Sequence, residues 1–117
     1  MENIVEQIIE QGILYDFYGP LLTDHQQKIY EAVVYENLSL GEVGQEYGIS
    51  RQAVHDLIKR CDKILRNYED KLGLIKRFEG SKKRLSEIKA LTDELEIEAP
   101  ETAHRVNELV DTLLEEW

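Results

Sequence analysis

Apolar residues recur at spacings of three and four along most of the chain, and no segment alternates between apolar and polar residues as a half-buried strand would. This pattern predicts an all-α protein. A first helix is expected to end at Tyr18, and isoleucine and tyrosine residues between Ile4 and Tyr18 share one of its faces. Gly19 and Pro20 then stop the helix.

Short polar motifs mark the beginning of the next three helices. The pairs Thr23/Gln26 and Ser39/Glu42 have the spacing of a capping box, in which the first side chain accepts a hydrogen bond from a free backbone N–H and the second side chain reaches back. Ser50 is expected to cap the helix that follows. Each of these residues precedes a run of helically spaced apolar positions.

An apolar stripe continues from Ala53 to Leu72 and predicts one long helix. A helix of about 20 residues spans roughly 30 Å. Gly73 interrupts the pattern, and the sequence leaves open whether the helix is continuous as far as Leu72. A further helix is expected around residues 85–95, and Pro100 opens the last one.

The segment LGEVGQEYGISRQAVHDLIKR, residues 40–60, meets the requirements of a helix-turn-helix. Two helices that cross closely need a small residue at the contact, and Gly44 stands there. The turn needs a residue that tolerates positive φ, and Gly48 fits. Contacts between the two helices require apolar or aromatic side chains, and these are Val43, Tyr47, Ile49, Val54 and Leu57. The second helix is then free to present polar side chains outward.

A helical wheel places polar and basic side chains opposite the apolar stripe of the long helix. The first residues of a recognition helix usually meet base edges, so Arg51 is suited to guanine and Gln52 to adenine. Lys59, Lys63 and Arg66 are better placed for phosphates. The predicted nucleic-acid-binding residues are Ser39, Ser50, Arg51, Gln52, His55, Lys59, Lys63 and Arg66.

Two further points qualify this surface. The hydroxyls and free N–H groups at Ser39 and Ser50 are suited to hold phosphate. Asp56 lies near the same face and would repel a nucleic-acid backbone. Helices capped in this way and joined by a glycine turn also occur in proteins that bind only other proteins, so a protein-interaction role on the same scaffold stays open.

The net charge of −10 at first argues against nucleic-acid binding, but the distribution of charge changes that view. Residues 1–49 hold one basic and nine acidic residues, and residues 86–117 hold two basic and ten acidic ones. Residues 50–85, between them, hold eleven basic and five acidic residues. Because phosphate affinity depends on local cation density, binding through this middle segment is allowed, whereas strong sequence-independent binding is not expected.

The motifs FYG, LLTDHQQKIY, LSLGEVGQEYGISRQAVHDLIKR and ILRNYEDKLGL follow one another in this order. Together they resemble the YlxM family of small DNA-binding proteins of Gram-positive bacteria, over roughly residues 12–80. The middle also resembles the helix-turn-helix of sigma-factor region four, which usually has an acidic residue where Gln52 stands, so promoter readout does not carry over at that position. The family has been linked, chiefly by gene neighbourhood, to the signal recognition particle pathway. The resemblance thus implies a regulatory or accessory role there.

Nothing in the sequence has the spacing of a catalytic, metal or cofactor site. His25, His55 and His104 are far apart, and Cys61 falls on the apolar stripe, whereas zinc needs about four ligands. Neither a glycine-rich phosphate loop nor a serine elbow is present. We therefore expect no catalytic residue, no metal and no cofactor in a protein that is not an enzyme.

The sequence also predicts a cytoplasmic location. It contains no run of about eighteen apolar residues, so no membrane span is expected. The first residues lack the basic start of a signal peptide, and a single cysteine excludes an intrachain disulfide.

We divide the chain into a helix-turn-helix domain with an N-terminal helix over residues 1–80 and a C-terminal helical extension over residues 81–117. The apolar stripes at 53–72, 85–95 and 106–117 exceed what one small core needs. They either pack on the first helix or join two chains. We expect a homodimer through the C-terminal helices, since helix-turn-helix proteins commonly dimerise on one duplex.

Three functional interpretations remain. The first is a DNA-binding regulator that uses the helix beginning after Ser50. The second is an RNA-binding or protein-binding accessory factor of the signal recognition particle, for which the basic residues between 76 and 84 would matter more than Arg51 and Gln52. The third is a protein-interaction module that uses the acidic helices and the C-terminal apolar stripe.

Overall fold

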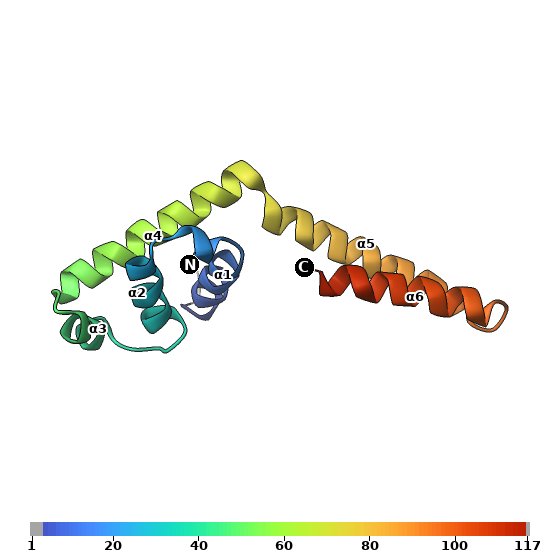
Figure 1. Ribbon diagram of the computed structural model, residues 1–117, viewed down its shortest axis with the longest axis horizontal. Coiled ribbons are helices and arrows are strands. Elements are labelled where there is room, and N and C mark those ends of the chain that lie inside the picture. The colour runs from blue at the N-terminus through green and yellow to red at the C-terminus, as the bar shows by residue number, and fades with distance from the viewer. Residues whose placement is uncertain (1–3, 117) are drawn as a thin grey trace. The chain divides into compact units, whose positions relative to one another are not determined.

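The computed structural model describes residues 4–116, and over these residues it is helical and contains no strand (Figure 1). This confirms the predicted all-α class and the helix-turn-helix core. The elements in chain order are α1 (Ile4–Tyr18), η1 (Gly19–Leu21), α2 (Asp24–Val34), α3 (Leu40–Tyr47), α4 (Arg51–Leu72), α5 (Leu74–Glu94) and α6 (Pro100–Glu115). The chain divides between Ile75 and Lys76 into two compact units, here called the N-terminal and C-terminal units.

The predicted caps form at the predicted residues. The Thr23 hydroxyl accepts a hydrogen bond from the Gln26 N–H at 3.2 Å, and the Gln26 side chain accepts one from the Thr23 N–H at 3.0 Å. Ser39 and Glu42 make the same reciprocal pair at 3.1 Å. The Ser50 hydroxyl accepts from the Ala53 N–H at 3.0 Å and begins α4.

The crossing of α3 and α4 explains the two glycines of the helix-turn-helix. A Cβ at Gly44 would lie 2.6 Å from the carbonyl oxygen of Ile49, so no larger residue fits without moving the backbone. Gly48 ends α3 with φ 69°, the left-handed conformation that glycine adopts at little cost. Val43 of α3 faces α4, Val54 of α4 faces α3, and both side chains are fully buried.

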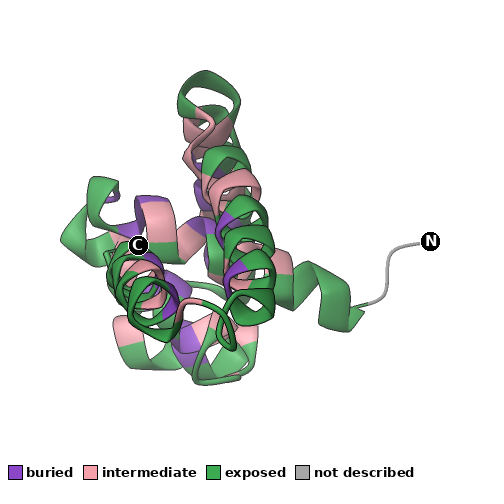
Figure 2. Ribbon diagram, turned by 90° about the vertical axis from the view of Figure 1, so that its right-hand side faces the viewer, coloured by how far each residue is buried: buried purple, intermediate pink, exposed green. Residues whose placement is uncertain are grey.

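The core of the N-terminal unit forms where α1, α2, α3 and α4 meet. Figure 2 colours each described residue of the chain by its burial. The core includes two fully buried tyrosines, Tyr18 and Tyr30, beside Ile29 and Leu65. Cys61 is also fully buried there, and burial raises the pKa of its thiol to about 11. The thiol is therefore part of the apolar core.

The first helix buries only its second half. Leu14 and Tyr18 lie in the core, but Ile4 is 72% exposed and Ile8 is 41% exposed, although all of them belong to one helix. The common apolar face expected from the sequence thus extends beyond the surface that the other helices of this unit cover.

The helix α4 is continuous from Arg51 to Leu72, which settles the point that the sequence left open. Gly73 ends it with φ 62°, and α5 begins at the next residue. The basic segment after Gly73 is therefore helical and is not a loop.

In the C-terminal unit, α5 and α6 lie side by side and antiparallel (Figure 1). Leu85, Thr92, Ala103 and Val110 are its buried side chains among the described residues. Lys89 and Asp111 form an ion pair between the two helices, with 2.9 Å between the ammonium nitrogen and a carboxylate oxygen.

Candidate nucleic-acid interface

The first turns of α4 have an apolar inner side and a polar outer side. Val54 and Ile58 are buried on the inner side, while Arg51, Gln52 and His55 are exposed on the outer side. The tight turn at Gly48 and the Ser50 cap fix where this helix starts. The arrangement is that of a helix-turn-helix in which the N-terminal side chains of the second helix are exposed.

Three basic side chains on the outer side of this helix are exposed. Arg51, Lys59 and Lys63 are exposed, and none of them forms an ion pair with another residue in the part of the chain that the structure describes. The first turn of α4 also contains no acidic residue. Exposed cations favour an anionic partner, and Arg51 also lies beside the free N–H groups at the start of the helix.

Asp56 limits the same surface. Its carboxylate accepts a hydrogen bond from the Gln52 side-chain amide at 2.9 Å and lies 3.6 Å from Nδ1 of His55. Gln52 therefore has to turn away from Asp56 before its amide can pair with both polar groups of an adenine edge.

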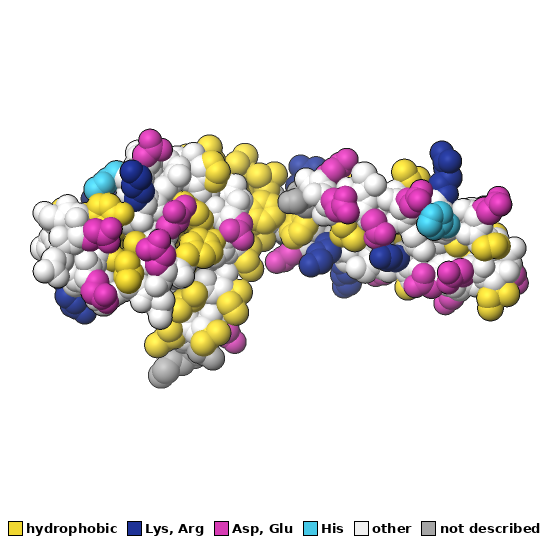
Figure 3. Space-filling model, turned by 60° about the horizontal axis from the view of Figure 1, so that its bottom comes forward, with side chains coloured by type: hydrophobic (Ala, Val, Ile, Leu, Met, Phe, Trp, Pro, Cys, Tyr) yellow, Lys and Arg dark blue, Asp and Glu magenta, His cyan; other side chains and the backbone are white. Residues whose placement is uncertain are grey.

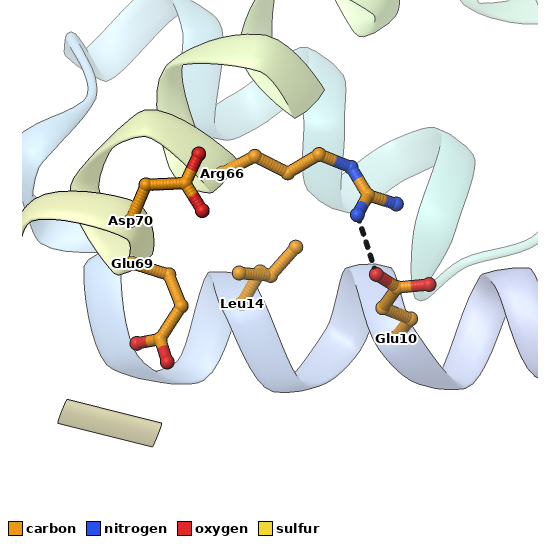
Figure 4. Close-up of a pocket in the computed structure, with 5 residues that line it drawn as sticks. All are labelled: Glu10, Leu14, Arg66, Glu69 and Asp70. Atoms are coloured by element: carbon orange, nitrogen blue, oxygen red, sulfur yellow. Dashed lines mark hydrogen bonds and ion pairs between the residues drawn. The ribbon is translucent and has the colours of Figure 1, made fainter. Parts of the chain in front are cut away.

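Arg66 lies in a different environment from Arg51, Lys59 and Lys63. Its guanidinium donates to Glu10 of α1 at 2.6 Å, and the two residues border a hollow of about 230 Å³ that also involves Leu14, Glu69 and Asp70 (Figure 4). The guanidinium points toward α1 in this view. A phosphate at Arg66 would have to compete with a carboxylate that already holds the side chain.

The two serines among the predicted binding residues both serve as caps. At Ser39 the capping partner is the Glu42 carboxylate, whose pKa is lowered because it accepts hydrogen bonds from the Ser39 backbone and hydroxyl. At Ser50 the corresponding position is Ala53, and Arg51 follows the cap directly. The helix start at Ser50 is therefore better suited to an anion than the one at Ser39, where a carboxylate already stands.

Hydrogen bonds between tyrosines and carboxylates hold α4 against α1 and α2, and their partners are too far apart in the sequence to be predicted from it. The Tyr30 hydroxyl donates to Asp62 at 2.6 Å, and the Gln11 amide of α1 donates to the same carboxylate at 3.0 Å. Burial, followed by the hydrogen bond to Asp62, raises the pKa of Tyr30. Tyr30 and Asp62 are 32 residues apart, so no local spacing signals the pair.

A second bond of this kind lies at the far end of α4. The Tyr18 hydroxyl donates to Glu69 at 2.5 Å and accepts from the Leu74 N–H at 3.2 Å, while Glu69 also accepts from the Ile75 N–H at 3.0 Å. Tyr18 and Glu69 thus satisfy the first backbone donors of α5, which have no partner within that helix. Burial, then the bond to Glu69, raises the pKa of Tyr18.

No group of three or more His, Cys, Asp or Glu side chains that could hold a metal ion occurs within residues 4–116. Nor is any helix among these residues both long and apolar enough to cross a membrane.

Comparison with known proteins gives a consistent result. Residues 5–106 match the model of the UPF0122 family, which is described as "Putative helix-turn-helix protein, YlxM / p13 like". A UPF0122 protein of Desulforamulus reducens is 44% identical over 105 residues, covering 89% of this chain and 90% of the relative. One from Bacillus velezensis is 39% identical over 99 residues, covering 85% and 90%. A third, from Shouchella clausii, is 36% identical over 111 residues, covering 94% and 96%.

Proposed function

The chain belongs to the UPF0122 family of YlxM/p13-like helix-turn-helix proteins, and on this premise we propose that it is a DNA-binding regulatory protein that reads DNA with α4. The observation that carries the proposal is the outer face of α4, where Arg51, Lys59 and Lys63 are exposed and without ionic partners among the described residues. The chain around this helix is acidic, so a basic face at this position is a local exception.

Each side chain of this face has a role in the proposal. Arg51 and Gln52, on the first turn, contact base edges in the major groove, as the start of a recognition helix usually does. Lys59 and Lys63 lie two and three turns further along α4 and contact phosphates. Arg66 contributes only where a phosphate displaces Glu10.

The acidic flanks shape the expected binding. They lower the affinity of the protein for any duplex with which it makes no base contacts, because non-specific affinity depends on how many phosphates the protein neutralises. The protein should therefore depend more on sequence, and less on charge alone, than a basic helix-turn-helix protein does.

The test is a fluorescence-anisotropy titration of pooled genomic DNA fragments at two salt concentrations. We expect tight binding to a subset of fragments that persists at the higher salt concentration. Lys59→Ala and Lys63→Ala should each weaken binding to all sequences and reduce the salt slope by about one. Lys28→Ala removes an exposed lysine of α2, outside the proposed face, and serves as the matched control. Unchanged binding by both α4 variants would refute this surface.

A second candidate is an RNA-binding or protein-binding accessory factor of the signal recognition particle pathway, the role that the YlxM resemblance implies. The observation that favours it is the start of α5, where Lys76, Arg77, Lys82, Lys83 and Arg84 are exposed on about two and a half turns of helix. Reversing the charge of residues 82–84 separates the candidates. Loss of binding to the signal recognition particle RNA, with DNA binding retained, favours the second candidate. Unchanged DNA binding by a protein that binds this RNA neither before nor after the change favours the first.

A further inference from the structure

The C-terminal unit exposes more large apolar side chains than it buries. Among its described residues, Leu85 and Val110 are the large aliphatic side chains in the buried class. Six others are between 41% and 94% exposed: Ile88, Leu91, Leu95, Ile97, Leu109 and Leu113. Figure 3 shows apolar side chains at the surface of this unit among acidic and basic ones. A concentration of exposed aliphatic side chains on so small a unit indicates an interaction surface.

Most of these side chains lie on one flank of the α5–α6 pair, which we call the apolar flank. Leu85 of α5 and Leu113 of α6 line a common hollow of about 300 Å³ together with Ser81 and Arg84. Ile88 stands one turn after Leu85 on α5.

Because α5 and α6 are antiparallel, the α6 residue that lies beside Ile88 comes one turn before Leu113. Leu109 precedes Leu113 by one turn and thus comes beside Ile88. The ion pair between Lys89 and Asp111 lies on the opposite flank by the same helical geometry. The apolar flank is therefore one continuous surface built by both helices, and residues of its own unit leave it uncovered.

Charge along α5 identifies the occupant of this flank. Along the exposed side of α5, Lys83 and Arg84 come first in the chain, and Glu87 and Glu94 follow. Leu91, which is 62% exposed, lies between the two acidic residues in the sequence. A copy of this helix laid antiparallel on itself brings its basic half against the acidic half of the other, whereas a parallel copy opposes like charges.

We propose that two copies of this chain pair through their apolar flanks, with the α5 helices antiparallel about a two-fold axis. Such an interface is isologous, so each contact occurs twice and the charge pattern of α5 complements itself. The inference rests on residues outside the α4 face and stands independently of what that face binds.

The first test measures the association constant by sedimentation equilibrium without nucleic acid. We expect a reversible dimer of about twice the 13.6 kDa chain. Ile88→Gln combined with Leu109→Gln should weaken association at least tenfold, because both side chains are exposed in the single chain and covered only in the dimer. Ile4→Gln changes an exposed isoleucine of α1 and should leave the association constant unchanged. A monomer at all concentrations, or equal losses in both variants, would overturn the proposal.

The second test addresses orientation. Lys83→Glu with Arg84→Glu places carboxylates at all four of these positions, and Glu87→Lys with Glu94→Lys places cations at all four. At low salt each pair of changes should weaken self-association several-fold, and all four together should restore it, since complementarity returns with the sign reversed. Circular dichroism confirms that each variant keeps its helices. A fourfold variant as weak as the twofold ones would rule out antiparallel pairing.

Discussion

The two units of this chain are both built from α-helices but differ in the contacts that join the helices. In the N-terminal unit, fully buried side chains such as Ile29, Val54 and Leu65 join four helices, and tyrosine hydroxyls tie the helices to one another through carboxylates. In the C-terminal unit, two helices share few buried apolar side chains, and among the described residues the buried hydroxyl of Thr92 bonds to Ile88 of its own helix. The first unit is specified by contacts between distant segments, whereas the second leaves most of its large apolar side chains exposed.

This difference indicates which unit can fold independently of the other. A single pair of helices buries too little apolar surface to offset the loss of chain entropy, and units of about 40 residues usually need additional support. The N-terminal unit has a core that includes two buried aromatic rings, so it has the means to fold without help. Four substitutions test whether the difference between the units is real.

The largest effect is expected at Gly44. Because a Cβ there would lie 2.6 Å from the Ile49 carbonyl oxygen, Gly44→Val has to push α3 away from the turn. We expect a loss of about 3 kcal/mol in the free energy of unfolding, measured in urea. Gly41→Ala in the same helix is the control, since the nearest atom to its Cβ is Ser39 Oγ at 3.9 Å and alanine favours helix. Equal destabilisation by the two changes would argue against the close crossing.

A smaller effect is expected at Tyr30. Tyr30→Phe removes the donor to Asp62 and leaves a partly buried carboxylate with Gln11 as its remaining side-chain partner. We expect a loss of about 1–3 kcal/mol in the free energy of unfolding. Tyr68→Phe is the matched control, because that ring stacks on Tyr18 but its hydroxyl forms no hydrogen bond to another described residue. If both variants unfolded at the same urea concentration, the bond to Asp62 would contribute nothing.

The corresponding change in the C-terminal unit should be nearly neutral. Thr92→Val keeps the shape of the side chain and removes a hydroxyl that bonds only to the Ile88 carbonyl oxygen, at 2.6 Å. Replacing a polar group by an apolar one of the same shape costs little when no partner is left buried and unpaired, so we expect a change within about 0.5 kcal/mol. Thermal unfolding followed by circular dichroism measures it. A loss as large as that of Tyr30→Phe would remove the distinction between the units.

The smallest effect concerns the exposed carboxylate of Glu42. Its pKa in the folded protein lies below the ordinary value of 4.5 because it accepts hydrogen bonds from Ser39. The stability that this bond adds is therefore complete above the unfolded pKa and is lost as the pH falls through the lower, folded value. Glu42→Gln keeps an acceptor that does not titrate. The difference in urea midpoint between wild type and variant should shift in favour of the variant between pH 6 and pH 3, and a constant difference would contradict the assignment.

Local motifs made much of the fold predictable. The Thr23 and Ser39 capping boxes depend on residues three positions apart, and Gly44 and Gly48 on the fixed geometry of one turn, so each could be read without knowing the rest of the chain. The continuity of α4 up to Leu72 could not be read in this way, because a glycine after a long stripe fits either a kink within a helix or its end.

The candidate site was less predictable than the helices. A helical wheel puts Arg66 on the same outer face as Lys63, but the structure engages Arg66 with Glu10, 56 residues earlier in the sequence. Likewise, Asp62 receives bonds from Gln11 and Tyr30, which only the fold brings to it. Pairings of this kind depend on how helices cross, and that information is not carried by the spacing within one helix.

The rate at which a thiol reagent labels Cys61 reports how often the core of the N-terminal unit opens. Cys61 is the single cysteine of the chain, it is fully buried, and burial raises the pKa of its thiol to about 11, which makes the reactive thiolate scarcer than in an exposed cysteine. A thiol reagent must therefore wait until α4 separates from its neighbours. The labelling rate of the unmodified protein at a given reagent concentration then reports the frequency of that opening. A ligand that binds α4 should slow the labelling without contacting the sulfur.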